Sequence, residues 1–321
     1  MRIKGIGVSL MQNQVVSNLR VMEEKLKKIT TLGLEVVEIP VEGLGVIING
    51  AINSRQLEVY TKLLKGFPLQ YTTHAPLDLN LFHSDDFEIE RRLLLASLEV
   101  SAAIGARMIT YHPGRFVAET EFLYHPQVWQ EYSQAQKEEL MHRERDVMRE
   151  AAARARALDI GIGMENLRPY LDYPQYCYAE IPHHLARQIE AIAHPAIGMT
   201  LDVGHLYMAC RVYNLDLIAE LNAAAPHVIH LHIHDNFGKS SYSWEKNQYQ
   251  LLLRGRGDMH IPIGEGEVPI ATILQALAPY FDGYLIHELR ADYETVWPGL
   301  RDRYTAIISR TRQKESAGQR S

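Results

Sequence analysis

Residues 228–236 read VIHLHIHDN, in which three histidines alternate with apolar residues. Side chains two apart on a β-strand point to the same face, so His230, His232 and His234 would share one face. Three buried imidazoles are hard to explain as core packing, because each ring would need its own hydrogen-bond partner. The stretch therefore predicts a strand that carries polar ligands to one side.

The same arrangement, a short apolar run that ends near an imidazole or a carboxylate, recurs along the chain. The other segments are TTHAP at 72–76, TYHPG at 110–114, GMENL at 163–167, TLDVGH at 200–205, GDMHIPIGEG at 257–266 and LIHELR at 285–290. Such side chains are the ligands that Zn²⁺, Mn²⁺ or Mg²⁺ need. Together the segments supply nine candidate metal ligands: His74, His112, Glu165, Asp202, His205, His232, Asp258, His260 and Glu288.

Ligands at successive strand ends converge only if the strands are parallel and arranged in a ring. The predicted strands, each short and bounded by Gly, Pro or Asn, span 3–9, 34–41, 69–74, 107–112, 160–166, 197–203, 228–234 and 284–289. The clearest helical patterns between them cover 18–31, 86–105, 134–157 and 269–280. A doubly wound open sheet would not gather ligands from six strands around one centre. The alternation therefore predicts an α/β protein, a single-domain (β/α)8 TIM barrel with its site at the C-terminal rim.

The predicted domain covers residues 1–310. Residues 238–257 are too long for a plain strand-to-helix connection, so we expect a rim insertion there, of the kind that serves as a lid or an oligomer contact. The polar stretch 311–321 is expected to form a flexible tail. Within strand 160–166, Gly161 and Gly163 share a face with Glu165, so we expect small residues beneath this ligand.

Bulk composition narrows the class of function. The chain has 321 residues, a formal net charge of −6 and two cysteines. Nothing in it resembles a signal peptide or a membrane span, so we expect a cytoplasmic enzyme without disulfides. The acidic balance and the lack of a Lys/Arg stripe make nucleic acid an unlikely partner.

Each motif also has an ordinary structural explanation. A histidine after a strand is often only hydrogen-bonded, HPG can be a turn, Glu165 can cap the following helix, and LDVGH can be an Asx turn. What favours a metal site is that each predicted strand from the third to the eighth supplies a candidate at the same depth.

The segments YHPG, MEN, LDVGH, HxHDN, DMHIPIGEGEV and HELR resemble those of the xylose isomerase-like TIM-barrel superfamily, in particular its sugar phosphate isomerase/epimerase and endonuclease IV branch. The resemblance covers about residues 1–310. It implies one divalent metal held by Glu165, Asp202, His232 and Glu288, as in the epimerases. In endonuclease IV three zinc ions are bound, and the additional ligands match His74, His112, His205, Asp258 and His260.

The resemblance implies a metal-dependent isomerase or epimerase that moves a proton α to the carbonyl of a ketose, an inosose or a related polyol. Glu165 and Glu288 would act as base and acid, while His205, Arg115 and Arg290 would contact substrate. We expect one to three divalent ions, Zn²⁺ or Mn²⁺, a sugar-like substrate and possible homodimers.

Two alternatives stay open. An endonuclease IV-like phosphodiesterase acting on abasic DNA would use the same ligands, but this chain has ENLRPY where an ENTAGQG-like stretch would follow the glutamate. A catalytically silent metal-binding barrel is the other alternative, although both glutamates are present.

Overall fold

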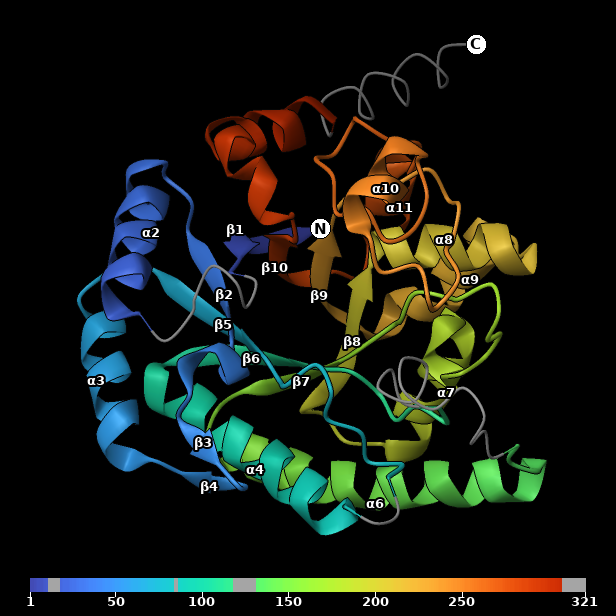
Figure 1. Ribbon diagram of the computed structural model, residues 1–321, viewed down its shortest axis with the longest axis horizontal. Helices are drawn as coiled ribbons and strands as arrows, with labels where there is room; N and C mark the ends of the chain where they lie inside the picture. Colours follow the sequence, from blue (N-terminus) through green and yellow to red (C-terminus); the bar gives the residue numbers. More distant parts are fainter. Residues whose placement is uncertain (11–17, 84–85, 118–130, 308–321) are drawn as a thin grey trace.

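The computed structural model describes residues 1–10, 18–83, 86–117 and 131–307 (Figure 1). Parallel strands close into a barrel in the order β1-β10-β9-β8-β7-β6-β5-β2. This confirms the predicted single-domain TIM barrel, and each predicted strand overlaps an observed one. The barrel strands are β1 (Arg2–Ser9), β2 (Val36–Pro40), β5 (Gln70–His74), β6 (Ala106–Tyr111), β7 (Gly161–Glu165), β8 (Ile197–Asp202), β9 (Val228–Ile233) and β10 (Asp282–His287).

Helices surround the strands in Figure 1 and cover their apolar outer side. They are α2 (Leu19–Thr31), α3 (Ser54–Lys65), α4 (Phe87–Ile104), α6 (Gln134–Ala157), α7 (Pro182–Ile192), α8 (Val203–Tyr213), α9 (Leu217–Ala224), α10 (Gln248–Leu253) and α11 (Ile270–Leu277). Short 3₁₀ segments are η1 (Val41–Leu44), η2 (Tyr178–Glu180), η3 (Ala225–His227) and η4 (Ala291–Gly299). The four helical patterns expected from the sequence are confirmed at nearly the same residues.

Local signals explain where these helices begin and end. The Asn18 side chain accepts hydrogen bonds from the first backbone amides of α2, and Ser133 forms a capping box with Gln136 at the start of α6. Gly105 ends α4 in the left-handed conformation, with φ of 83°, which glycine adopts without steric cost. The small antiparallel hairpin of β3 (Ile47–Ile48) and β4 (Ala51–Ile52) was not predicted, because two-residue strands give no periodic signal.

The barrel interior beneath Glu165 is tightly filled, which confirms the expectation of small residues there. A Cβ atom on Gly163 would overlap Thr200 Oγ1 and lie 3.2 Å from the Thr200 backbone nitrogen. The Thr200 hydroxyl is itself 3.2 Å from that of Thr110. A methyl group at position 163 therefore requires the Thr200 side chain or its strand to shift.

We therefore expect Gly163→Ala to destabilise the protein by about 1–3 kcal/mol, the usual cost of overfilling a packed interior. Chemical denaturation followed by circular dichroism measures this free energy of unfolding. Gly299→Ala is the matched control, because its new Cβ would meet nothing within 4 Å, and it should change stability by less than about 0.5 kcal/mol. Equal stability of the two variants would contradict the packing described for the barrel interior.

The rim insertion at 238–257 contains α10 and closes on itself, because the Gly257 amide donates to the Lys239 carbonyl at 2.7 Å. It rests on the loop that follows β7, where the Leu171 amide donates to the Ser241 carbonyl at 3.0 Å. The insertion ends immediately before Asp258. The tail expected at 311–321 lies outside the described residues. Within the described part of the chain, no helix combines the length and apolarity needed to cross a membrane.

Candidate metal centre

All nine candidate ligands lie at the C-terminal ends of barrel strands or in the loop or helix that follows, as His205 does in the first turn of α8, and all fall into adjoining groups of potential metal ligands. In each group the ligand atoms lie within 4.8 Å of one another. We name them the central group (Glu165, Asp202, His232, Glu288), the first flanking group (His74, His112, Glu165), the second flanking group (His205, His234, Asp258, His260) and the floor group (Glu38, His230, His232).

The central group takes one ligand from each of four consecutive strands or strand ends, β7 to β10. His232 Nδ1 lies 2.9 Å from Glu165 Oε1 and 3.4 Å from Glu288 Oε2. Burial would raise the pKa of Glu165, but the charge of His232 and hydrogen bonds from His112 and His232 hold it well below its usual range. The carboxylates of this group therefore remain charged, which a cation requires.

The first flanking group shares Glu165 with the central group. His74 Nε2 and His112 Nε2 lie 3.2 Å and 3.1 Å from Glu165 Oε2. The two rings meet edge to face, with centroids 4.7 Å apart. One carboxylate thus faces ligands on both sides, an arrangement that suits a bridge between two ions.

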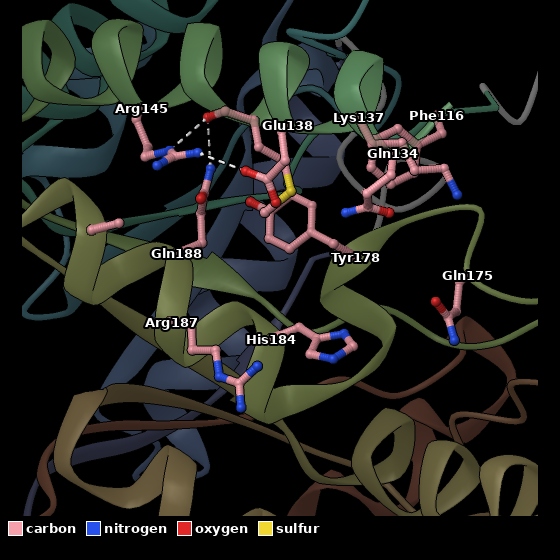
Figure 2. Close-up of a pocket in the computed structure, with 12 residues that line it drawn as sticks. Phe116, Gln134, Lys137, Glu138, Arg145, Gln175, Tyr178, His184, Arg187 and Gln188 are labelled. Atoms are coloured by element: carbon pink, nitrogen blue, oxygen red, sulfur yellow. Dashed lines mark hydrogen bonds and ion pairs between the residues drawn. The ribbon is translucent and has the colours of Figure 1, made fainter. Parts of the chain in front are cut away.

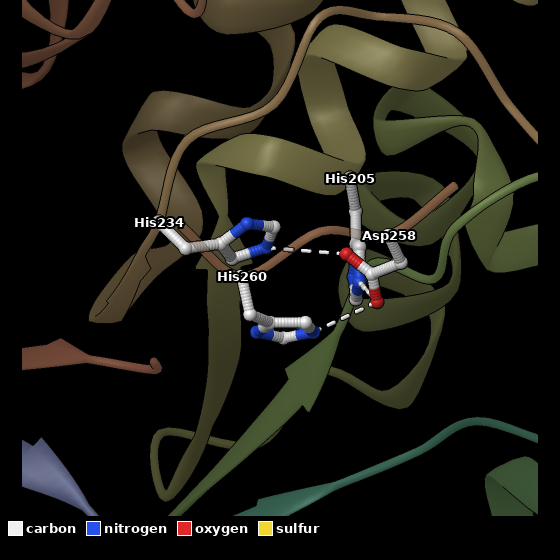
Figure 3. A group of neighbouring side chains, drawn as sticks. All are labelled: His205, His234, Asp258 and His260. Atoms are coloured by element: carbon white, nitrogen blue, oxygen red, sulfur yellow. Dashed lines mark hydrogen bonds and ion pairs between the residues drawn. The ribbon is translucent and has the colours of Figure 1, made fainter. Parts of the chain in front are cut away.

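In the second flanking group the three imidazoles lie around Asp258, as Figure 3 shows. Asp258 Oδ2 lies 2.8 Å from His260 Nε2 and 3.0 Å from His205 Nε2, and Oδ1 lies 3.6 Å from His234 Nε2. His234 also contacts the central group, because its Nε2 is 3.0 Å from Asp202 Oδ1. The second flanking group is therefore continuous with the central one.

Backbone carbonyls orient three of the candidate imidazoles. In each ring Nδ1–H donates to a carbonyl and Nε2 points at a carboxylate, so Nε2 is the nitrogen available to a metal ion. The donations are His74 to Ala75 at 2.7 Å, His205 to Asn166 at 2.9 Å and His260 to Glu288 at 2.9 Å. Such outer hydrogen bonds are typical of metal-ligating histidines.

The donor set fits divalent cations. Two carboxylate oxygens, Asp202 Oδ2 and Asp258 Oδ1, are buried without a hydrogen-bond partner among the described residues. Asp202 also lies beside two other carboxylates, those of Glu165 and Glu288. Burial lowers the pKa of His205, but the charges of Asp202 and Asp258 raise it to about 9. The centre thus balances its carboxylates with protons, and metal binding would replace those protons as the positive charge.

The loop that carries His260 is fixed by Asp235, in the HDN motif. Asp235 accepts hydrogen bonds from the amides of Gly264 at 2.8 Å and Val268 at 2.9 Å. A Cβ atom on Gly266 would overlap Asp235 Oδ1, which explains a glycine at this position. The DMHIPIGEGEV motif therefore supplies two candidate ligands, and it also forms the loop that positions them.

Two of the three residues expected to contact substrate are engaged elsewhere. The buried Arg115 donates to the carbonyls of Leu77 at 2.8 Å and Leu79 at 3.1 Å, which braces the loop after β5. Arg290 pairs with Asp292 at 2.9 Å and lies over the Tyr249 ring. The structure places the third, His205, among the candidate ligands. Contact of these residues with substrate stays a prediction.

Four residues of the site were not predicted as ligands or partners. Glu38 is fully buried on β2, and its signal was a lone charge within the apolar run VVEIPV at 36–41. His230 and His234 were recognised as facing inward but not as ligands. Arg168, from the ENLRPY stretch, donates to Asp258 Oδ2 at 3.0 Å; a sequence gives no sign of a contact 90 residues away.

A separate pocket of about 380 Å³ lies between α6 and α7, outside the barrel (Figure 2). Lys137, Arg145, Tyr178 and Gln188 are among the residues that line it. Its described lining includes none of the nine candidate ligands, so it is distinct from the metal centre.

Comparison with known proteins agrees with the barrel fold. The family model described as xylose isomerase-like TIM barrel matches residues 26–310. No curated protein matches the chain in sequence. Among solved structures, a D-tagatose 3-epimerase-like protein superposes with a TM-score of 0.67 at 20% identity, covering 97% of this chain and 99% of that one.

Two further solved structures contain metals. An IolI protein with a bound zinc atom has a TM-score of 0.65 at 15% identity and covers 96% of this chain and 99% of its own. A xylose isomerase-like TIM barrel protein from Mycobacterium smegmatis, in complex with magnesium, has a TM-score of 0.66 at 15% identity, with 97% and 99% covered. At these identities the likeness establishes the fold.

Proposed function

The chain belongs to the xylose isomerase-like TIM barrel family, and from that premise we propose that it is a divalent-metal-dependent isomerase or epimerase. Its proposed substrate is a ketose, an inosose or a related polyol, in which a proton α to the carbonyl is moved. The observation that carries the proposal is the central group, in which Glu165 and Glu288 lie beside Asp202 and His232 at the mouth of the barrel.

The residues of the central group would have two roles, metal binding and proton transfer. A divalent ion bound there would polarise adjacent carbonyl and hydroxyl oxygens and lower the pKa of the carbon acid between them. Asp202 and His232, together with the carboxylates of Glu165 and Glu288, would hold the ion. Glu165 and Glu288, on β7 and at the end of β10, act as base and acid, one taking the proton from carbon and the other returning it on the opposite side or to the neighbouring carbon.

The flanking groups would then bind the remainder of the substrate. Imidazole nitrogens of His74, His112 and His205 are suited to hydrogen bonds with the hydroxyl groups of a polyol. Arg168, next to Asp258, adds a cation at the edge of the site. The residues around the central group are polar and mostly buried. A small hydroxylated molecule therefore fits there better than an extended polymer.

A second function, metal-dependent hydrolysis of a phosphodiester, is favoured by one specific observation. The central and first flanking groups share Glu165, and the second flanking group adjoins them, so the chain offers ligands for up to three ions. In that function Glu165 would bridge two ions and position a water for attack. The net charge of −6 and the ENLRPY stretch favour the small-molecule enzyme instead.

The experiment that tests the proposal is proton exchange in D₂O. Protein loaded with Mn²⁺ or Zn²⁺ is incubated with a panel of ketoses, ketose phosphates and inososes, and deuterium at the carbon α to the carbonyl is followed by NMR. We expect metal-dependent exchange with at least one substrate and no detectable binding of duplex DNA carrying an abasic analogue at physiological salt. Catalytic incision of such DNA, without exchange into any sugar, would replace the isomerase by the hydrolase.

A further inference from the structure

His232 is oriented differently from the other candidate imidazoles. Its Nδ1 faces the central group, and its Nε2 lies 3.2 Å from Glu38 Oε2. Backbone carbonyls fix His74, His205 and His260, whereas a side-chain carboxylate stands in that position for His232. The outer partner of this one ligand is therefore a residue that mutation can remove.

Glu38 is built into the floor of the barrel. It is completely buried on β2, one strand layer beneath the central group, and shares its face with Val36. Its Oε2 lies 3.0 Å from His230 Nε2 and accepts from the Thr72 hydroxyl at 3.3 Å. A carboxylate can accept from several donors at once, but it cannot donate when it is charged. The two nitrogens that face Glu38, Nε2 of His230 and Nε2 of His232, must therefore carry hydrogen.

We propose that Glu38 is a positioning residue that holds hydrogen on His232 Nε2 and so leaves the lone pair of His232 Nδ1 for a divalent ion in the central group. The inference rests on the proposed metal-dependent function, and it adds a residue that does not itself contact the ion. A carboxylate–histidine–metal arrangement raises the basicity of the ligating nitrogen and fixes the ring. Because both effects act through His232, loss of Glu38 weakens metal binding without removing a ligand.

The floor group could instead hold an ion of its own, since its ligand atoms are close enough together. Two features argue against that assignment. His232 would then need to ligate through both nitrogens, which requires loss of its last ring proton. His230 Nδ1 is buried with no hydrogen-bond partner among the described residues, whereas a ligating histidine normally donates its other N–H.

Zinc titration of the metal-free protein, in competition with a chelator, tests the role of Glu38. We expect Glu38→Gln to weaken zinc binding about 10–100-fold while the number of ions at saturation stays the same. A zinc affinity within about threefold of wild type would overturn the proposal, because that change is smaller than the expected range. Loss of one ion, with unchanged affinity for the rest, would overturn it in favour of a floor ion.

Glu220→Gln is the matched control. Glu220 is also a buried glutamate paired with a histidine, 2.8 Å from His183 Nδ1, but it lies on the outer helices. It should leave zinc affinity unchanged, and thermal unfolding of both metal-free variants shows whether either is misfolded. The titration uses no substrate, so an error in the proposed reaction would not alter its result.

A measurement on wild-type protein keeps the proposal testable if Glu38→Gln fails to fold. Long-range ¹H–¹⁵N NMR of the zinc-loaded chain, labelled at histidine, reports which ring nitrogen carries hydrogen. We expect His232 to carry it on Nε2 and to bind zinc through Nδ1. Hydrogen on Nδ1, or zinc on Nε2, would overturn the assignment of Glu38.

Discussion

Replacing Glu165 and Glu288 together by Gln is expected to abolish isomerase activity and to remove the ion of the central group. An amide keeps the shape of the side chain, but it supplies neither the charge that holds a divalent cation nor a base that accepts a proton from carbon. Each glutamate alone should cost at least about 10²-fold in kcat, the lower limit for losing a general acid or base. Activity in the D₂O exchange assay and metal content by mass spectrometry measure the two effects.

Glu267→Gln is the matched control for this pair, because Glu267 is exposed on the same rim. It should retain wild-type metal content and activity. Full activity in the Glu165→Gln, Glu288→Gln double variant would remove the metal-enzyme account altogether. Loss of activity with unchanged metal content would leave the glutamates as acid and base but not as ligands.

If the second flanking group holds an ion of its own, Asp258→Ala is expected to remove that ion while the central ion remains. Asp258 is the only carboxylate of that group and lies within 3.6 Å of each of its three imidazoles. Without it the group keeps neutral ligands only, which bind a divalent ion less strongly. His260→Ala should act in the same direction. Zinc content after gel filtration should then fall by about one ion per chain; if only the central group holds an ion, zinc content should stay unchanged.

Asp78→Ala and His142→Ala serve as controls, because both side chains are exposed and neither belongs to a ligand group. They should leave zinc content unchanged. Complete loss of all zinc from Asp258→Ala would show that the second flanking group and the central group are one site. Unchanged zinc content would show that the second flanking group binds no ion and contributes through its histidines.

Strand periodicity accounts for most of what the sequence could predict. Glu165, Asp202 and His232 stand at the ends of apolar runs, and a closed parallel barrel places all such ends at one rim. The fold and the convergence of the ligands therefore follow from one pattern. Gly163 is a further case, since its parity with Glu165 indicated a narrow interior before any contact was known.

Contacts between distant segments could not be predicted in the same way. Glu38 and His232 are 194 residues apart, and only the register of the closed barrel brings them together. Arg115 follows the HPG motif at the rim, yet its guanidinium turns into the loop after β5, where it donates to two backbone carbonyls. The direction of a side chain after a strand end depends on such local hydrogen bonds, and these cannot be read from a single sequence.

Metal content of the wild-type chain tests the central claim most directly. Protein purified without added metal, and protein reconstituted with excess Zn²⁺ or Mn²⁺ and then gel-filtered, are compared by mass spectrometry. The account predicts at least about one tightly held divalent ion per chain, absent from the Glu165→Gln, Glu288→Gln double variant. A wild-type chain that retains no ion after reconstitution, or a double variant that retains as much as wild type, would contradict it.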